Sequence, residues 1–121
     1  FINCKLMGLH FEHCNENGFT PSFDNCILNL SSFYKLKIKK IIFKNCGLQE
    51  VDFVEADLSA AIFDNCDLAG ATYDRTILEK ADFRTSYNYS INPQTNKIKK
   101  AKFTMPGILG LLDQYDIDIE L

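Results

Sequence analysis

The sequence predicts an all-β solenoid in which four five-residue units complete one square coil of 20 residues. Every fifth residue from Phe23 to Phe83 is large and apolar, at thirteen positions in succession. At this apolar content, chance would produce such a run with a probability of roughly 2 × 10⁻⁴. The residue two places earlier in each unit is usually small, most often Ala, Cys, Ser or Thr. A period of five fits neither a helix nor a flat strand, so the chain is expected to turn a corner in every unit.

Stacked coils would bring residues 20 apart into columns, with each coil rising about 4.8 Å above the last. The large positions mostly alternate between aromatic and aliphatic residues. Two opposite faces of the rod should therefore carry aromatic columns and the other two faces aliphatic ones. The expected core stacks include an aromatic column and a column of small thiols, namely Phe23, Phe43, Phe63 and Phe83, and Cys26, Cys46 and Cys66.

These units carry a family resemblance. The segment "ADLSAAIFDNCDLAGATYDRTILEKADF" (residues 56–83) resembles the A-[D/N]-L-x-x pattern of pentapeptide repeat proteins. The match covers roughly residues 1–11 and 21–103, and it implies a right-handed quadrilateral β-helix. A repeat run followed by an apolar C-terminal element is also similar to the quinolone-resistance (Qnr) proteins. That similarity implies a DNA mimic that binds DNA gyrase or topoisomerase IV, modulates quinolone susceptibility and forms a homodimer through its C-terminal end.

The chain is expected to form a single domain, 1–121, with the coils of the β-helix over residues 1–103. Two segments should interrupt these coils. The units centred on Phe1, Leu6 and Phe11 are offset by two residues from the later run. An insertion of about two residues is therefore expected within 12–22, where turn-forming residues predict a short loop. Residues 88–98 are rich in turn signals and predict an excursion within the final coil. Loops of solenoids often contact partners, so the candidate contact residues of the first loop are Glu16, Asn17 and Phe19.

Residues 104–121 lack the five-residue repeat and predict a C-terminal helix and tail. Pro106 suits the first turn of a helix, and the apolar residues of 105–115 lie near helical spacing, so a short capping helix is expected. The alternating segment 116–121 predicts a short strand. A solenoid end needs a cap because it exposes unpaired backbone and apolar core. The sequence leaves two roles open for the apolar residues of this segment: they either only cap the rod, or cap it and also form a dimer interface. The candidate residues are Ile108, Leu109, Leu111, Leu112, Ile117 and Ile119.

The charge composition argues against a general nucleic-acid binder, because the 16 acidic residues outnumber the 13 basic ones and give a net charge of −3. We therefore expect no direct contact with nucleic acid. In the 20-residue register many charges alternate in sign up a column, which predicts paired ladders such as Asp24, Lys44, Asp64 and Arg84. The acids left without a vertical partner form the candidate partner-binding surface, namely Glu50, Asp52, Asp67 and Asp74.

We expect no cluster of catalytic or metal-binding residues. Cys4 and Cys14 should point inward and His10 and His13 outward, so these residues should not converge on a metal ion. A filled core leaves no pocket, and neither histidine is placed to activate a cysteine, so we expect a non-enzyme without cofactors. Five cysteines without a CxxC pair suggest reduced thiols in the cytoplasm. No apolar run approaches the roughly 20 residues that span a bilayer.

Two functions from different classes follow. The first is a Qnr-like protein that binds a type II topoisomerase, as the resemblance implies. The alternative is a structural scaffold or interaction rod with an unrelated protein partner. A continuous negative stripe on the surface would favour the first, and alternating signs would favour the second.

Overall fold

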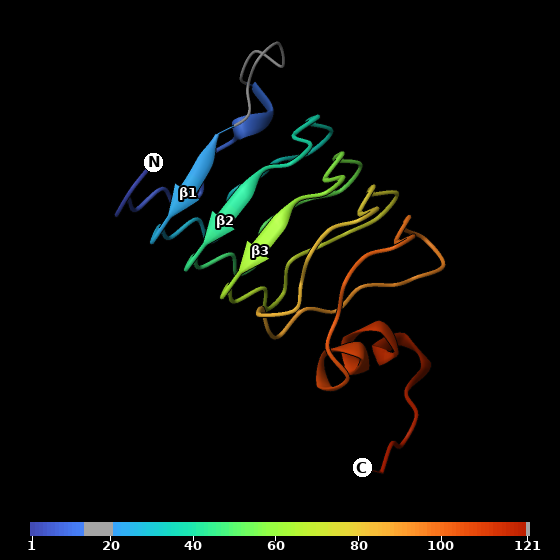
Figure 1. Ribbon diagram of the computed structural model, residues 1–121. Coiled ribbons are helices and arrows are strands. Elements are labelled where there is room, and N and C mark those ends of the chain that lie inside the picture. Colours follow the sequence, from blue (N-terminus) through green and yellow to red (C-terminus); the bar gives the residue numbers. More distant parts are fainter. Residues whose placement is uncertain (14–20, 121) are drawn as a thin grey trace.

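The computed structural model describes residues 1–13 and 21–120, which form a rod of stacked coils with a small cap at the C-terminal end (Figure 1). Three short strands lie side by side along one face of the rod. They are β1 (Ser22–Asp24), β2 (Ile42–Lys44) and β3 (Ile62–Asp64). A short 3₁₀ helix, η1 (Phe11–His13), ends the first coil. Two further 3₁₀ helices, η2 (Pro106–Leu111) and η3 (Asp113–Tyr115), form the cap.

The coils stack in parallel with a register of 20 residues, as the repeat predicts. The three strands pair in the order β1-β2-β3, with Phe23 opposite Phe43 and Phe43 opposite Phe63. Isolated bridges such as Asp82 to Lys102 continue the same spacing. In the first coil the spacing is 22, as between Ile2 and Asp24, which confirms the two-residue offset. The loop candidates Glu16, Asn17 and Phe19 lie outside the described residues.

The core consists of the large and small inward positions of each unit. All thirteen large residues from Phe23 to Phe83 are buried. Phe23, Phe43, Phe63, Phe83 and Phe103 form one stacked column, with ring centroids 4.7–5.4 Å apart. A second column, Phe11, Phe33, Phe53 and Tyr73, rises from the opposite face. The two columns meet edge to face, so aromatic rings fill the centre of the rod.

Every corner of the regular coils depends on a left-handed residue. At each fifth position from Asn25 to Lys80, φ lies between +52° and +73°. On most faces this residue is the third of a β-turn. In one such turn the amide N–H of Ala61 donates to the carbonyl oxygen of Leu58 at 3.0 Å, as in a type II turn. Eleven of the twelve positions hold residues other than glycine, so burial of two side chains per unit must offset the strain.

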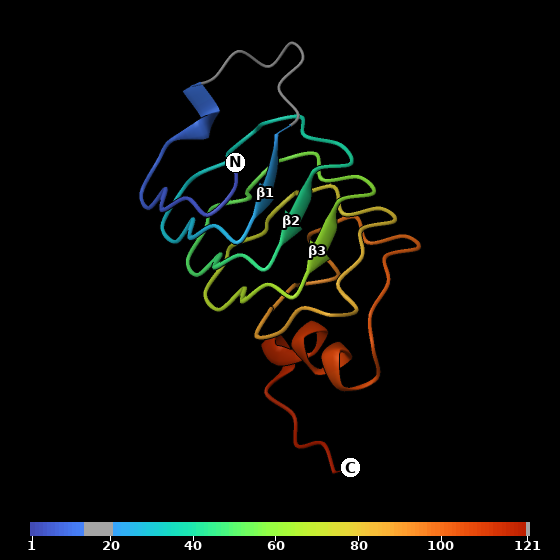
Figure 2. The ribbon, with the colours of Figure 1, turned by 60° about the vertical axis from the view of Figure 1, so that its left-hand side comes forward.

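We name the four faces after the central residue of one coil. The Phe43 face carries the three strands, and the Leu48 face, the Phe53 face and the Leu58 face follow in chain order. The Leu48 face and the Leu58 face therefore lie on opposite sides of the rod. Figure 2 shows the coils as successive layers, with the N-terminus at one end and the cap at the other.

The C-terminal element is not the helix that the sequence predicts. Instead of an α-helix over 105–115, the structure has η2 and η3, which are 3₁₀ helices of six and three residues. Pro106 does begin η2, but two glycines weaken helix formation, and Asp116 closes the segment in a left-handed conformation. The strand predicted for 116–121 is also wrong for 116–120, which pair with no other segment among the described residues. No helix in the described chain is long and apolar enough to cross a membrane.

Candidate interaction surfaces

Two of the four predicted acidic residues have a structural task in their own turns. Asp52 accepts a hydrogen bond from the backbone N–H of Val54 at 2.8 Å, and Asp67 accepts one from Ala69 at 3.1 Å. The same contact recurs at Asp57 and Asp82. An aspartate just before the large inward residue therefore holds the amide two residues later, as in an Asx-turn. The sequence analysis missed this role, although the recurrence of Asp before the large residue signals it.

Asp67 is the most strongly held of these carboxylates. The side chains of Gln49 and Asn88 donate to it at 2.7 and 3.1 Å. Partial burial alone would raise the pKa of the Asp67 carboxyl, but these bonds and the Ala69 amide outweigh it. The pKa of Asp67 therefore lies below its ordinary value.

The lowered pKa of Asp67 predicts a loss of stability in acid. The contribution is complete above the unfolded-state pKa of about 3.9 and disappears as pH falls through the lower folded-state pKa. Urea denaturation of the wild type should show a steeper fall in unfolding free energy below pH 4 than Asp67→Asn. The Asn88→Ala variant, which lacks one donor, should lie between them. Parallel curves for the wild type and Asp67→Asn would contradict this role.

The four acidic candidates occupy two adjacent faces around one corner. Glu50 stands at the corner between the Leu48 and Phe53 faces, directly below Gly70 of the next coil. A methyl group built at Gly70 would lie 2.9 Å from Cγ of Glu50. Asp67 lies on the Leu48 face, and Asp52 and Asp74 lie on the Phe53 face.

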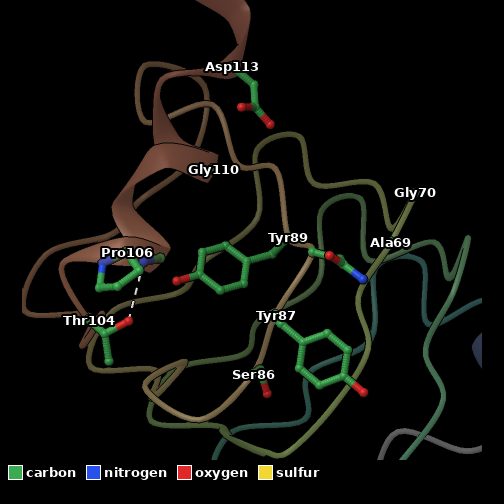
Figure 3. A pocket seen from close by; sticks show the side chains of 11 residues that line it. Ala69, Gly70, Ser86, Tyr87, Tyr89, Thr104, Pro106, Gly110 and Asp113 are labelled. Atoms are coloured by element: carbon green, nitrogen blue, oxygen red, sulfur yellow. Dashed lines mark hydrogen bonds between the residues drawn. The ribbon is translucent and has the colours of Figure 1, made fainter. Parts of the chain in front are cut away.

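The cap adds a fifth acid to this corner, which sequence reasoning did not find. Asp113, the first residue of η3, lines two concave surfaces together with Gly70. The larger, about 570 Å³, lies between the last coils and the cap, and Figure 3 shows Tyr87, Tyr89, Thr104 and Asp113 around it. Glu50, Asp74 and Asp113 border Gly70. We call these three acids together with the two on the adjoining faces the acidic corner: Glu50, Asp52, Asp67, Asp74 and Asp113.

Few cations compensate the acidic corner. Arg75 lies beside it and is shared between Asp74, at 3.6 Å, and Glu55, at 3.9 Å. The Glu55–Arg75 pair joins residues 20 apart and is therefore an ion pair of the predicted ladder kind. Elsewhere ion pairs depart from the predicted columns, because Arg84 binds Asp82 at 2.9 Å, and Asp64 instead accepts a hydrogen bond from Thr85.

The C-terminal candidates divide into an inner and an outer set. Leu111 packs against the core of the rod. Leu109, Leu112, Ile117 and Ile119 line a groove of about 330 Å³ with Asp113 and Asp116. Ile117 and Ile119 are exposed, whereas Ile108 is half-buried. The end of the cap is thus a partly apolar surface with acidic neighbours.

The cysteines form part of the core. Cys4, Cys26, Cys46 and Cys66, the cysteines of the described chain, are free thiols. Cys26, Cys46 and Cys66 are buried and donate to backbone carbonyl oxygens, as Cys46 does to Lys44 at 3.2 Å. Burial raises the pKa of Cys26, and the neighbouring Cys46 side chain together with burial raises that of Cys66. No cluster of three potential metal ligands occurs among the described residues.

A family model for the pentapeptide repeat region matches residues 17–90, which is more than half of the chain. The chain belongs to the pentapeptide repeat family. For this family member, the left-handed corners and stacked aromatic columns explain why a five-residue unit repeats.

Solved structures of other pentapeptide repeat proteins resemble this one at low sequence identity. The pentapeptide repeat protein Rfr23 from the cyanobacterium Cyanothece 51142 is 19% identical over 86% of each chain, with a TM-score of 0.40. A trypsin-treated form of QnrB1, a plasmid-mediated fluoroquinolone resistance protein, is 15% identical over 99% of this chain and 81% of its own, also with a TM-score of 0.40. Full-length QnrB1 is 12% identical, with a TM-score of 0.33. No curated protein sequence matches this pentapeptide repeat protein.

Proposed function

We propose that this pentapeptide repeat protein is a non-catalytic binding protein whose acidic corner engages the DNA-binding surface of a protein, with a type II topoisomerase as the leading partner. The observation that carries the proposal is the set of five acids on the Leu48 face, the Phe53 face and the cap, three of which border Gly70, beside a shared arginine. Carboxylates on a rigid rod present negative charge at fixed spacing, as phosphates do on duplex DNA. Such a surface steers a partner with a positive DNA-binding groove.

The Qnr resemblance of the sequence supports the choice of DNA gyrase or topoisomerase IV, and with it an effect on quinolone susceptibility. The partly apolar end of the cap supports a homodimer, since Leu109, Leu112, Ile117 and Ile119 would bury apolar surface against a second copy. No catalytic role is proposed, because the 570 Å³ concave surface between the last coils and the cap is lined by one charged side chain, Asp113, and by no cysteine, histidine or lysine among the described residues.

Binding to purified gyrase and topoisomerase IV tests the proposal. Sedimentation velocity at micromolar protein should show a complex with at least one of the enzymes, and a dimer of the free protein. The triple variant Glu50→Gln, Asp74→Asn, Asp113→Asn should weaken binding at least tenfold. It spares Asp52 and Asp67, whose carboxylates hold their own turns.

The matched control removes the same charge elsewhere, through Asp24→Asn, Asp64→Asn and Glu79→Gln. It should bind within threefold of the wild type. Absence of a complex with either enzyme, or an equal loss in both triple variants, would refute the role of the acidic corner.

A scaffold with an unrelated protein partner is the second candidate. The turn-holding role of Asp52 and Asp67 favours it, because it gives these acids a reason to be present without any partner. Affinity capture with mass spectrometry, in which the acidic-corner variant retains the same partner, would support this alternative.

A further inference from the structure

Basic residues gather on the Leu58 face, which lies opposite the Leu48 face and next to the Phe53 face. Of the 13 basic residues in the chain, seven project from the Leu58 face and its last corner, and all seven are exposed. Among the described residues, this face holds two acids, Asp57 and Glu79, and both are half-buried. We call these lysines the basic face: Lys37, Lys39, Lys40, Lys80, Lys97, Lys99 and Lys100.

The lysines of this face are largely uncompensated. Lys39 approaches Asp57 at 3.7 Å, and Asp57 also accepts a 2.6 Å hydrogen bond from the Ser59 hydroxyl. The other six lysines have no ion pair within the described chain. The positive field of this face is therefore open to solvent, although the protein as a whole carries a net charge of −3.

A hollow lies within the basic face. Lys40, Ala60, Lys80 and Lys100 follow one corner column, because successive coils are joined there by backbone hydrogen bonds of 2.8–3.0 Å. Lys40 and Lys80 are thus separated by two coil rises, about 10 Å. The small Ser59 and Ala60 between them leave a depression of about 310 Å³, which three lysines and one acid line: Lys39, Lys40, Lys80 and Glu79. A phosphate group in this depression would meet three lysine side chains against the single Glu79 carboxylate, so the local charge still favours an anion.

The rest of the face indicates what kind of polyanion fits. No aromatic side chain projects from its described positions, so it lacks the stacking platform that single-stranded nucleic acids use. The one large apolar side chain at these described positions, Ile77, is half-buried, so they offer no exposed apolar group to insert into a lipid bilayer. A rigid row of lysines without base-reading groups matches a regular phosphate backbone.

We propose that the basic face binds the phosphate backbone of duplex nucleic acid independently of its sequence. This departs from the expectation of no nucleic-acid contact, which rested on net charge averaged over the whole molecule. The proposal is independent of the proposed topoisomerase binding, because none of the five acids of the acidic corner lies on the Leu58 face.

Fluorescence anisotropy with a labelled 24-base-pair DNA duplex of random sequence tests the proposal. Binding should be measurable at 50 mM KCl and should weaken roughly 100-fold by 200 mM, as expected for about four phosphate contacts. Two duplexes of unrelated sequence should bind within twofold of each other. The variant Lys39→Glu, Lys40→Glu, Lys80→Glu should lose at least 30-fold in affinity.

The control variant Lys5→Glu, Lys35→Glu, Lys44→Glu changes the net charge equally but leaves the basic face intact, so it should bind within threefold of the wild type. Circular dichroism confirms that both variants fold. Failure to bind at 50 mM KCl, or an equal loss in both variants, would overturn the proposal. Binding to phosphatidylserine vesicles without duplex binding, or low-salt self-association that displaces the duplex, would also overturn it.

Discussion

Replacing Phe63 by alanine is expected to lower the free energy of unfolding by about 3–5 kcal/mol, the usual cost of deleting a buried aromatic side chain. Phe63 is 1% exposed and stacks between Phe43, at 5.3 Å, and Phe83, at 4.7 Å. It also meets Phe53 edge to face at 5.9 Å. Coils above and below are already joined by backbone bonds, so they cannot collapse into the cavity.

Chemical denaturation followed by circular dichroism measures this effect, and Phe1→Ala is its matched control. Phe1 ends the same side of the core and stacks on Phe23 at 5.1 Å, but it is 55% exposed. Its replacement should cost about 1 kcal/mol, the value of an aromatic contact without deep burial. Equal losses for Phe1→Ala and Phe63→Ala would contradict a rod stabilised by its central aromatic columns.

The solenoid could be predicted because its physical cause repeats along the sequence. A coil of constant size buries the same positions in each turn, so thirteen large residues display the period directly. The first-coil offset at Phe1, Leu6 and Phe11 was visible for the same reason. The left-handed corners were hidden, because residues such as Leu30, Lys40 and Glu55 occupy them instead of glycine. Burial within each unit imposes that conformation against local preference.

The charged surfaces were harder to predict than the core. Columns of residues 20 apart follow from the period. A face, however, includes three outward positions from each of its units, so its total charge becomes visible only when the charges are summed for each of the four faces. Six of the seven lysines fall in two separate segments, 35–44 and 84–102, and Lys80 lies between these segments, so their sequence positions do not show that they share one surface. Asp113 joined the acidic corner only through the position of η3.

The cap could not be predicted because its conformation depends on a tertiary contact. Apolar residues at 108–112 indicated a helix, but η2 lies directly on Tyr89 of the last coil. The carbonyl oxygen of Gly110 accepts a hydrogen bond from the amide of Ile91 at 2.9 Å. The contact with Tyr89 leaves no room for a Cβ atom at Gly110, which faces its backbone carbonyl group, or at Gly107, which faces its side-chain hydroxyl.

Replacing Gly110 by alanine is therefore expected to undock the cap. A methyl group at this position would lie 2.1 Å from the carbonyl oxygen of Tyr89, which is backbone and cannot rotate away. Either η2 or the last coil must shift, which would break the bond from Ile91 and expose Tyr89, now 5% exposed. The cost should reach about 3 kcal/mol, the upper end for overpacking, although alanine favours helix formation more than glycine does.

Hydrogen exchange distinguishes an undocked cap from general unfolding. In Gly110→Ala the amide of Ile91 should lose protection, while that of Ala61, far along the rod, should keep it. Gly47→Ala is the matched control, because its new methyl group would meet the movable side-chain oxygen of Asn29 at 3.0 Å rather than backbone. It should cost less than 1 kcal/mol, the lower limit of overpacking. Unchanged protection of Ile91 in Gly110→Ala would show that the cap is not held by this glycine contact, and the end of the rod would then need another explanation for its closure.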